Sequence, residues 1–175
     1  TNTVGGKLSD LAYQLTGGTQ RNRMAQSGNA ERHRGKPWSL LAISTGNTSF
    51  VEMISRVKGF PKAEAQRILE FRTEQKFFGS SSKAETDKLW PAFKGNYGHA
   101  GIRFVQWVIN NRAECERTIK HVQSRVDEKA ELGPENRFWS AAVTAIISAL
   151  MIGRKAGVLP FEVKPVFAFA VNRLR

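Results

Sequence analysis

The sequence predicts a mainly helical protein that begins with a small mixed α/β portion and continues as an all-helical lobe. Two observations carry this prediction. A short apolar run, Leu40–Ser44, has the length and composition of an inner β-strand and is followed by small polar residues. Beyond Gly79–Lys83 (GSSSK), which is typical of a flexible joint, apolar residues instead recur at helical spacing. We therefore expect two domains, residues 1–78 and residues 84–175.

Local signals place the elements of the first domain. In chain order the predicted elements are a helix over residues 7–15, a hairpin or exposed loop over 20–36, the strand over 40–44 and a helix over 50–57. Apolar residues at helical spacing indicate the two helices, and glycine residues end them. Thr48 or Ser49 is the expected N-cap of the second helix. The segment Lys62–Arg72 is open between a helix and a short inner strand.

The second domain is predicted to be all-helical. The expected helices cover residues 101–111, 114–131, 134–152 and 163–174. In the second of these, Ile119, Val122 and Val126 fall on one face, which indicates its buried side. The stretch Phe138–Ile152 is strongly apolar, but it is short for a membrane span and is interrupted by hydroxyl side chains. We therefore expect a buried helix and no membrane partner.

The composition favours nucleic acid as a partner. The 175 residues include 27 Lys and Arg against 15 Asp and Glu, a net charge of +12, and the isoelectric point is about 10.4. Such an excess favours a polyanion, with nucleic acid ahead of a membrane surface. Cys115 is the single cysteine, which excludes a disulfide within the chain and fits the reducing cytoplasm. The three histidines lack metal-ligand spacing, so we expect no metal site.

The predicted hairpin concentrates positive charge. It holds one acid, Glu31, and its cations are Arg21, Arg23, Arg32, Arg34 and Lys36. Guanidinium groups on a protruding hairpin are suited to contact the phosphate backbone of DNA. Two alternatives stay open: a solvated surface loop, and an arginine that acts on the nucleotide of a neighbouring subunit.

Small polar residues, Ser44 to Asn47, end the predicted strand. The carboxyl end of an inner parallel strand is where open α/β sheets bind ligands. In nucleotide-dependent machines an Asn or Thr at this place orients the water that attacks a γ-phosphate. Asn47 is therefore a candidate catalytic residue, with Thr45 as a candidate nucleotide contact. An ordinary strand end followed by a helix cap explains the same residues.

The run LSDLAYQLTGGTQRNRMAQSGNAERHRGKPWSLLAISTGNTS, from Leu8 to Ser49, closely resembles the central part of a family of phage- and prophage-encoded ATPases. These are helicase-like replication proteins, often fused to or encoded with primases. The segments RILEFR, YGHAG and ENRFW follow in the same order, so the resemblance covers most of the chain. It implies a partial RecA-like or AAA+-like sheet with Asn47 as the sensor asparagine. For the intact protein it implies DNA, ATP and Mg²⁺, a homo-oligomer and a primase partner.

The resemblance also gives roles to two arginines. Arg67 falls where an arginine finger often lies, so it would act as a catalytic residue in the site of an adjacent protomer. Arg137 would be a second-sensor arginine that contacts the nucleotide from the helical lobe. Arginines beside apolar runs are more often ion-paired at the surface, and an ion-paired Arg67 is the alternative.

The chain departs from the family in the motifs that bind nucleotide. A P-loop needs G-x-x-x-x-G-K-[ST] after a strand, and this sequence contains none. The acidic pair of the preceding strand is absent as well; in the family it lies just before the residues that match Thr1–Thr3. We therefore expect the C-terminal portion of a DNA helicase or replication ATPase, which does not hydrolyse ATP by itself. The alternative is a non-enzymatic basic helical module that binds nucleic acid or docks on a protein.

Overall fold

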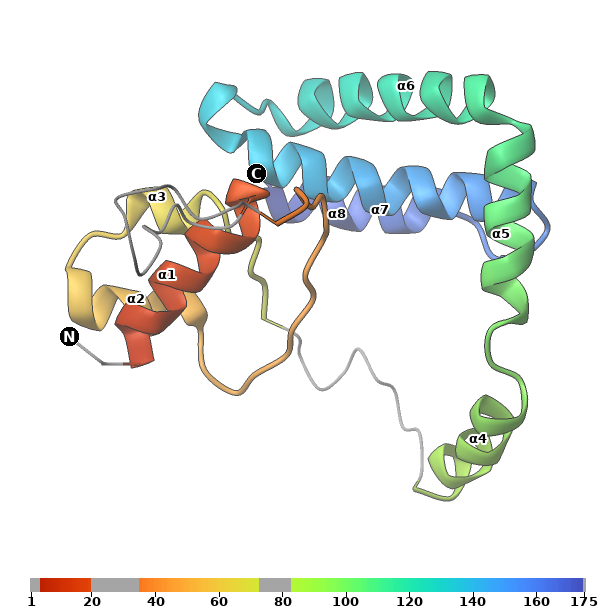
Figure 1. Ribbon diagram of the computed structural model, residues 1–175, viewed down its shortest axis with the longest axis horizontal. Helices are drawn as coiled ribbons and strands as arrows, with labels where there is room; N and C mark the ends of the chain where they lie inside the picture. Colours follow the sequence, from red (N-terminus) through yellow and green to blue (C-terminus); the bar gives the residue numbers. More distant parts are fainter. Residues whose placement is uncertain (1–3, 20–34, 73–82, 175) are drawn as a thin grey trace, which may run out of the picture. The chain divides into compact units, whose positions relative to one another are not determined.

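A computed structural model describes residues 4–19, 35–72 and 83–174, and every regular element in them is a helix (Figure 1). The elements are α1 (Val4–Gly17), α2 (Phe50–Lys58), α3 (Lys62–Ala65), α4 (Lys83–Gly95), α5 (His99–Asn110), α6 (Arg112–Ala130), the short 3₁₀ helix η2 (Pro134–Asn136), α7 (Arg137–Lys155) and α8 (Lys164–Leu174). The chain divides into two compact units, Thr1–Glu70 (unit 1) and Phe71–Arg175 (unit 2).

Unit 1 is held together by the packing of α1 against α2. Gly5 lies so close to α2 that a Cβ atom at this position would lie 2.7 Å from Val57 Cγ2 and closer still to the carbonyl oxygen of Met53. Only a residue without a side chain permits this approach. Ile54 of α2 is fully buried, and the short helix α3 contacts α1. The close approach of α1 and α2 therefore depends on glycine at position 5.

Side chains satisfy the free N–H groups at the start of α2. The Ser49 hydroxyl accepts a hydrogen bond from the backbone N–H of Glu52 at 3.0 Å, which confirms one of the two predicted N-caps. The Glu70 carboxylate accepts two more, from the N–H groups of Phe50 at 3.0 Å and Val51 at 3.3 Å. A carboxylate at this end also interacts favourably with the helix dipole. Glu70 thus ties the segment after α3 to α2.

The predicted strand over residues 40–44 is wrong, and with it the expected RecA-like or AAA+-like sheet remnant. The described residues contain no strand, and residues 35–46 have no regular structure. Leu40, Leu41 and Ile43 are 54%, 47% and 82% exposed instead of buried. A strand is stable only where a neighbour completes its hydrogen-bond ladder, and no such neighbour lies among the described residues. The mainly helical character of the chain is confirmed.

Trp38 fastens this irregular segment to the end of α1. Its backbone N–H donates to the carbonyl oxygen of Gly18 at 2.8 Å, and its indole N–H donates to that of Leu15 at 3.1 Å. Carbonyl groups at the end of a helix lack partners within the helix, so these bonds satisfy them. Gly18 has a φ of +66°, a left-handed conformation that glycine adopts at helix ends. The irregular segment is therefore fixed at Trp38 to the end of α1.

The core of unit 2 lies between α6, α7 and α8. The helices α6 and α7 run side by side in opposite directions and are joined through η2 (Figure 1). Buried residues recur every three or four positions; they include Cys115, Thr118, Val122, Val126 and Ala130 of α6 and Ser140, Val143, Thr144, Ile147, Ser148 and Ile152 of α7. The expected helices are thus confirmed. Of the predicted face of α6, Val122 and Val126 are buried, but Ile119 is 43% exposed.

One helix of unit 2 also has the length and composition of a membrane-spanning helix. By length and composition, the helix Pro134–Lys155 is long and apolar enough to cross one, and it is the one such helix among residues 4–19, 35–72 and 83–174. In the structure 39% of its most apolar window is buried within the protein. The core helix of a globular protein meets the same criteria.

Three hydroxyl groups are buried along α7. Ser140, Thr144 and Ser148 recur every fourth residue, and none of their hydroxyl oxygens has a hydrogen-bond partner among the described residues. Small side chains let two helices approach closely, but a buried hydroxyl group without a partner destabilises the fold. Replacing one of these hydroxyl groups with an apolar group is therefore expected to stabilise the fold.

Thr144→Val is expected to stabilise unit 2, because valine keeps the shape of threonine and removes the unpaired hydroxyl group. The expected gain is about 1 kcal/mol, or a rise in melting temperature of about 4 °C. Val143→Thr makes the reverse change at the neighbouring position, which is 3% exposed, and is expected to lower the melting temperature. Calorimetry on the full chain measures both; shifts of the same sign would contradict the assignment.

Candidate nucleic-acid interface

The residues predicted to face a nucleotide lie in the irregular stretch before α2. Thr45 and Asn47 are both exposed, and the strand whose end was expected to present them is absent from the described residues. No sheet edge therefore supports them as a pair of nucleotide contacts. Ser49, two residues on, has the ordinary role of an N-cap. The observed geometry corresponds to the helix-cap alternative for this segment.

The two arginines with expected nucleotide roles contact groups of their own units. In unit 1 Arg67 donates a hydrogen bond to the carbonyl oxygen of Ala63 at 2.6 Å, and its guanidinium group lies 4.4 Å from the centre of the Tyr13 ring. In unit 2 Arg137 is the first residue of α7, is exposed, and lies 5.0 Å from the centre of the Phe138 ring. Arg67 is thus integrated into the packing of α1 and α3, whereas Arg137 stands at the surface.

Most of the predicted DNA-contacting hairpin lies outside the described residues. This applies to Arg21, Arg23, Arg32 and Arg34. Lys36 is described; it is exposed and lies in the irregular segment that leads to Trp38. The hairpin contact stays a prediction from the sequence.

A buried polar cluster in unit 1 joins three helices. The Glu64 carboxylate of α3 accepts a hydrogen bond from the Ser9 hydroxyl of α1 at 2.7 Å and pairs with the Lys58 ammonium group of α2 at 2.7 Å. Lys58 also donates to Ser9 Oγ at 2.6 Å. Ser9 and Glu64 are 1% and 4% exposed, whereas 44% of the Lys58 side chain is exposed. This cluster was not predicted from the sequence.

The electrostatics of the cluster favour a structural role. The hydrogen bond from Lys58 holds the pKa of Glu64 below its usual value, and the same bond to Glu64 raises the pKa of Lys58. A serine–lysine pair works in catalysis only when the lysine is neutral and can take the serine proton. Here Lys58 stays charged, and Ser9 is closed to a substrate. The cluster therefore ties α1, α2 and α3 together.

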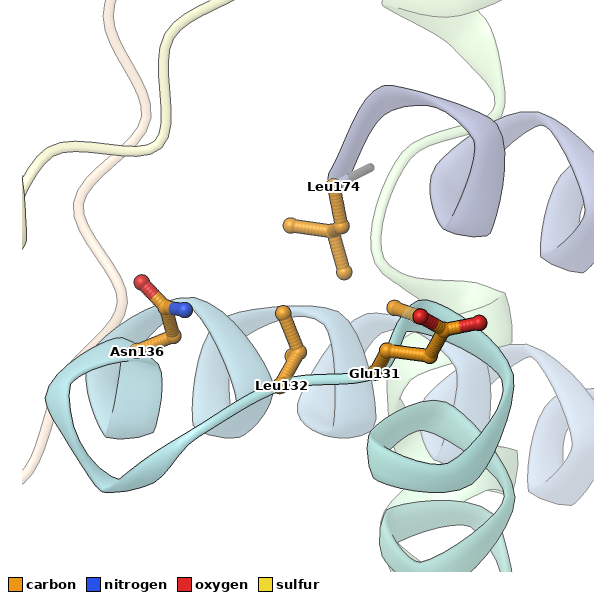
Figure 2. A pocket seen from close by; sticks show the side chains of 5 residues that line it. Glu131, Leu132, Asn136 and Leu174 are labelled. Carbon is orange, nitrogen blue, oxygen red and sulfur yellow. The ribbon is translucent and has the colours of Figure 1, made fainter.

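A pocket of about 420 Å³ lies at the end of the helices of unit 2 (Figure 2). It is lined by Ala130, Glu131, Leu132, Asn136 and Leu174. Figure 2 shows Leu174 of α8 opposite Leu132, with Glu131 and Asn136 to either side. One carboxylate and one amide do not supply a nucleophile with a base. Among the described residues no group of three or more His, Cys, Asp or Glu side chains is placed to hold a metal ion.

Three cations and a histidine lie on the exposed side of α6. Arg117, Lys120, His121 and Arg125 recur at spacings of three and four residues, so they share one face of the helix, and all four are exposed. We refer to them as the basic face. No acidic residue occurs from position 117 to position 126. The opposite side of α6 is packed into the core, so the basic face is presented by a fixed helix.

Neighbouring acids are already engaged by cations, one of which is Arg125 of the basic face. The pairs are Glu114 with Lys155, Glu116 with Arg112 at 3.2 Å, and Glu128 with Arg125 at 3.1 Å. Within the part of the chain that the structure describes, neither Arg117 nor Lys120 makes an ion pair. Their positive charge is therefore available to an external anion.

Comparisons with known proteins add no assignment. No protein-family model matches the sequence. A search of curated proteins found no match, and a search of solved structures found none.

Proposed function

We propose that unit 2 binds nucleic acid, through the basic face of α6. The observation that carries the proposal is the pair Arg117 and Lys120, two exposed cations on one face of a fixed helix that no described carboxylate neutralises. Cations of this kind contact phosphate groups and release counterions from the nucleic acid. This release supplies most of the sequence-independent affinity between protein and nucleic acid. The net charge of +12 supports a polyanionic partner.

The dimensions of the basic face suit a phosphate backbone. The eight steps from Arg117 to Arg125 rise about 12 Å along the helix axis. One strand of a duplex presents a phosphate about every 3.4 Å along its axis. The basic face therefore spans three to four phosphates, which positions the protein without reading bases.

The resemblance to phage-type replication ATPases supports DNA as the nucleic acid. The basic segment with Arg21, Arg23, Arg32 and Arg34 stays a second predicted contact. ATP hydrolysis with Asn47, a homo-oligomeric ring and a primase partner also stay predictions from the resemblance. They are not part of the proposed activity, because the role of Asn47 depended on a predicted sheet edge and that prediction is wrong.

Arg117→Gln/Lys120→Gln is expected to weaken DNA binding and to make it less dependent on salt. Each lost phosphate contact lowers the slope of log K against log salt concentration by about 0.7 for single-stranded DNA and about 0.9 for a duplex. The double variant should therefore lower the slope by about 1.4 to 1.8. Fluorescence anisotropy with a labelled oligonucleotide, titrated at several salt concentrations, measures this change.

Arg112→Gln/Arg154→Gln is the matched control. It also removes two positive charges from unit 2, but both of these arginines are engaged by carboxylates, Arg112 by Glu116 and Arg154 by Glu162. The control should change the slope much less. Equal slopes for the two double variants, or no DNA binding by the unmodified chain, would overturn the proposal.

A further inference from the structure

The helix α4 exposes two aromatic rings beside a lysine. Trp90 and Phe93 are 63% and 66% exposed, and we refer to these two residues as the aromatic pair. Phe93 and Lys94 follow Trp90 by three and four residues in α4, so the three side chains lie on one face of the helix. The Lys94 ammonium group lies 5.6 Å from the centre of the Trp90 ring. One face of α4 thus presents aromatic rings and a cation together.

The surface of α4 is open to a ligand. Every described side chain of α4 is exposed, and none of the helices that the structure describes packs extensively against it. An isolated helix of 13 residues is only marginally stable in water. Large exposed apolar side chains that gather on one face of a helix indicate a binding surface. The aromatic pair is therefore available to a ligand from outside the described residues.

The charges beside the aromatic pair favour an anionic ligand. The acids of α4, Glu85 and Asp87, precede the pair, and no acidic residue follows until Glu114. The charged residues on either side of the pair are Lys88 and Lys94, and neither makes an ion pair within the part of the chain that the structure describes. Aromatic rings next to available cations are typical of surfaces that bind single-stranded nucleic acid, because bases stack on the rings while the cations contact phosphates.

We infer that the aromatic pair stacks on unpaired bases, and that the nucleic acid bound by unit 2 is single-stranded. The inference rests on the proposed function, in which the basic face of α6 contacts phosphates of a single strand or of a duplex. In a duplex the faces of the bases are stacked on one another, so side chains cannot reach them. A single strand can instead turn its bases onto aromatic rings. The aromatic pair therefore adds affinity for a single strand alone.

A membrane surface is the other ligand that aromatic and basic side chains can suit. A helix that lies on a membrane needs an apolar face along its length. The large apolar residues of α4 are Leu89 and the aromatic pair, which together occupy little more than one turn. Stacking of a base needs a single ring, so this short segment is sufficient for a nucleic acid. The observations therefore favour a single strand over a membrane.

Fluorescence anisotropy on the full chain, with a labelled oligothymidylate and with a duplex of the same length, tests the inference. Trp90→Ala and Phe93→Ala should each weaken binding of the single strand by about tenfold, the loss of one stacked base, and should leave duplex binding unchanged. Both side chains are exposed, so neither variant disturbs a core. Phe161→Ala is the matched control; it removes an exposed aromatic ring of unit 2 that lies beside Glu162, and should change neither affinity.

Two further variants separate stacking from a general apolar contact. Trp90→Phe keeps a ring and should retain most of the affinity for the single strand, whereas Trp90→Leu keeps apolar area without a ring and should lose it.

Four results would overturn the inference: equal losses for single strand and duplex, an unchanged affinity of Trp90→Ala for the single strand, full affinity of Trp90→Leu, or binding to phosphatidylserine vesicles that is the only binding Trp90→Ala removes. In each case the proposed function stands if Arg117→Gln/Lys120→Gln still lowers the salt slope. No binding of either oligonucleotide by the unmodified chain would overturn the proposed function and the inference together.

Discussion

A single methyl group added at Gly5 is expected to weaken unit 1 by up to about 2 kcal/mol, because the overlap costs about 1–3 kcal/mol and the helix preference of alanine offsets about 1 kcal/mol. In Gly5→Ala the new Cβ atom would overlap the Met53 carbonyl oxygen and lie 2.7 Å from Val57 Cγ2. The Met53 oxygen belongs to the backbone of α2, so the overlap is relieved only when α1 and α2 move apart. The intrinsic helix preference of alanine over glycine, about 1 kcal/mol, acts in the opposite direction and is too small to prevent a net loss at the upper end of this range.

Gly17→Ala is the matched control for this prediction. Gly17 is the last residue of the same helix, and a Cβ atom there meets no atom within 4 Å. This variant should be neutral or slightly more stable. Urea unfolding, followed at the indole NMR resonance of Trp38, reports on unit 1 because Trp38 is its one tryptophan. Equal effects of the two variants would contradict the close approach of α1 and α2.

Glu64→Gln is expected to destabilise unit 1 by about 1.5 kcal/mol at neutral pH. Hydrogen bonds to charged groups contribute about 1.5–3 kcal/mol, and the lower end applies because 44% of the Lys58 side chain is exposed to water. Glu52→Gln removes a carboxylate from an exposed ion pair of the same unit, at Arg56, and should cost less than about 0.5 kcal/mol. If both substitutions cost the same, the buried cluster is not a tie between the helices.

The same variant should change how the stability of unit 1 depends on pH. Because the pKa of Glu64 is lowered by folding, its stabilisation is complete above the usual value of 4.5 and is lost as the pH falls through the lowered pKa. Because the pKa of Lys58 is raised, its stabilisation is complete below 10.5 and is lost as the pH rises through the raised pKa. Glu64→Gln should flatten the acid limb; urea midpoints from pH 2 to pH 7 measure it.

The helices could be predicted because their signals are local. Apolar residues at a spacing of three and four residues, the Ser49 cap and the glycines at helix ends each act within a few residues of chain, so α1, α2 and α5 to α8 follow from the sequence. The strand could not be predicted in this way. An apolar run such as Leu40–Ser44 is compatible with a strand, but whether it forms one depends on partners elsewhere in the chain.

The candidate sites likewise combine features that local sequence signals predict with features that depend on contacts between distant parts of the chain. The basic face of α6 was present in the sequence as an acid-free run of cations, but the availability of Arg117 and Lys120 emerges only from the ion pairs around them. The cluster of Ser9, Lys58 and Glu64 depends on the approach of three helices, and its one sequence signal is a lysine and a glutamate on either side of the Gly-Phe-Pro turn. Roles taken from the resemblance, such as that of Asn47, depended on a sheet.

The attachment of Trp38 to the end of α1 has a consequence for how this chain can vary. The backbone bond from Trp38 to Gly18 and the indole bond to Leu15 fix two points of the chain that are far apart in the sequence. Closing a segment of twice the length costs only about 0.6 kcal/mol more. An epitope or fluorescent label introduced between residues 18 and 38 should therefore leave the packing of α1 against α2 unchanged.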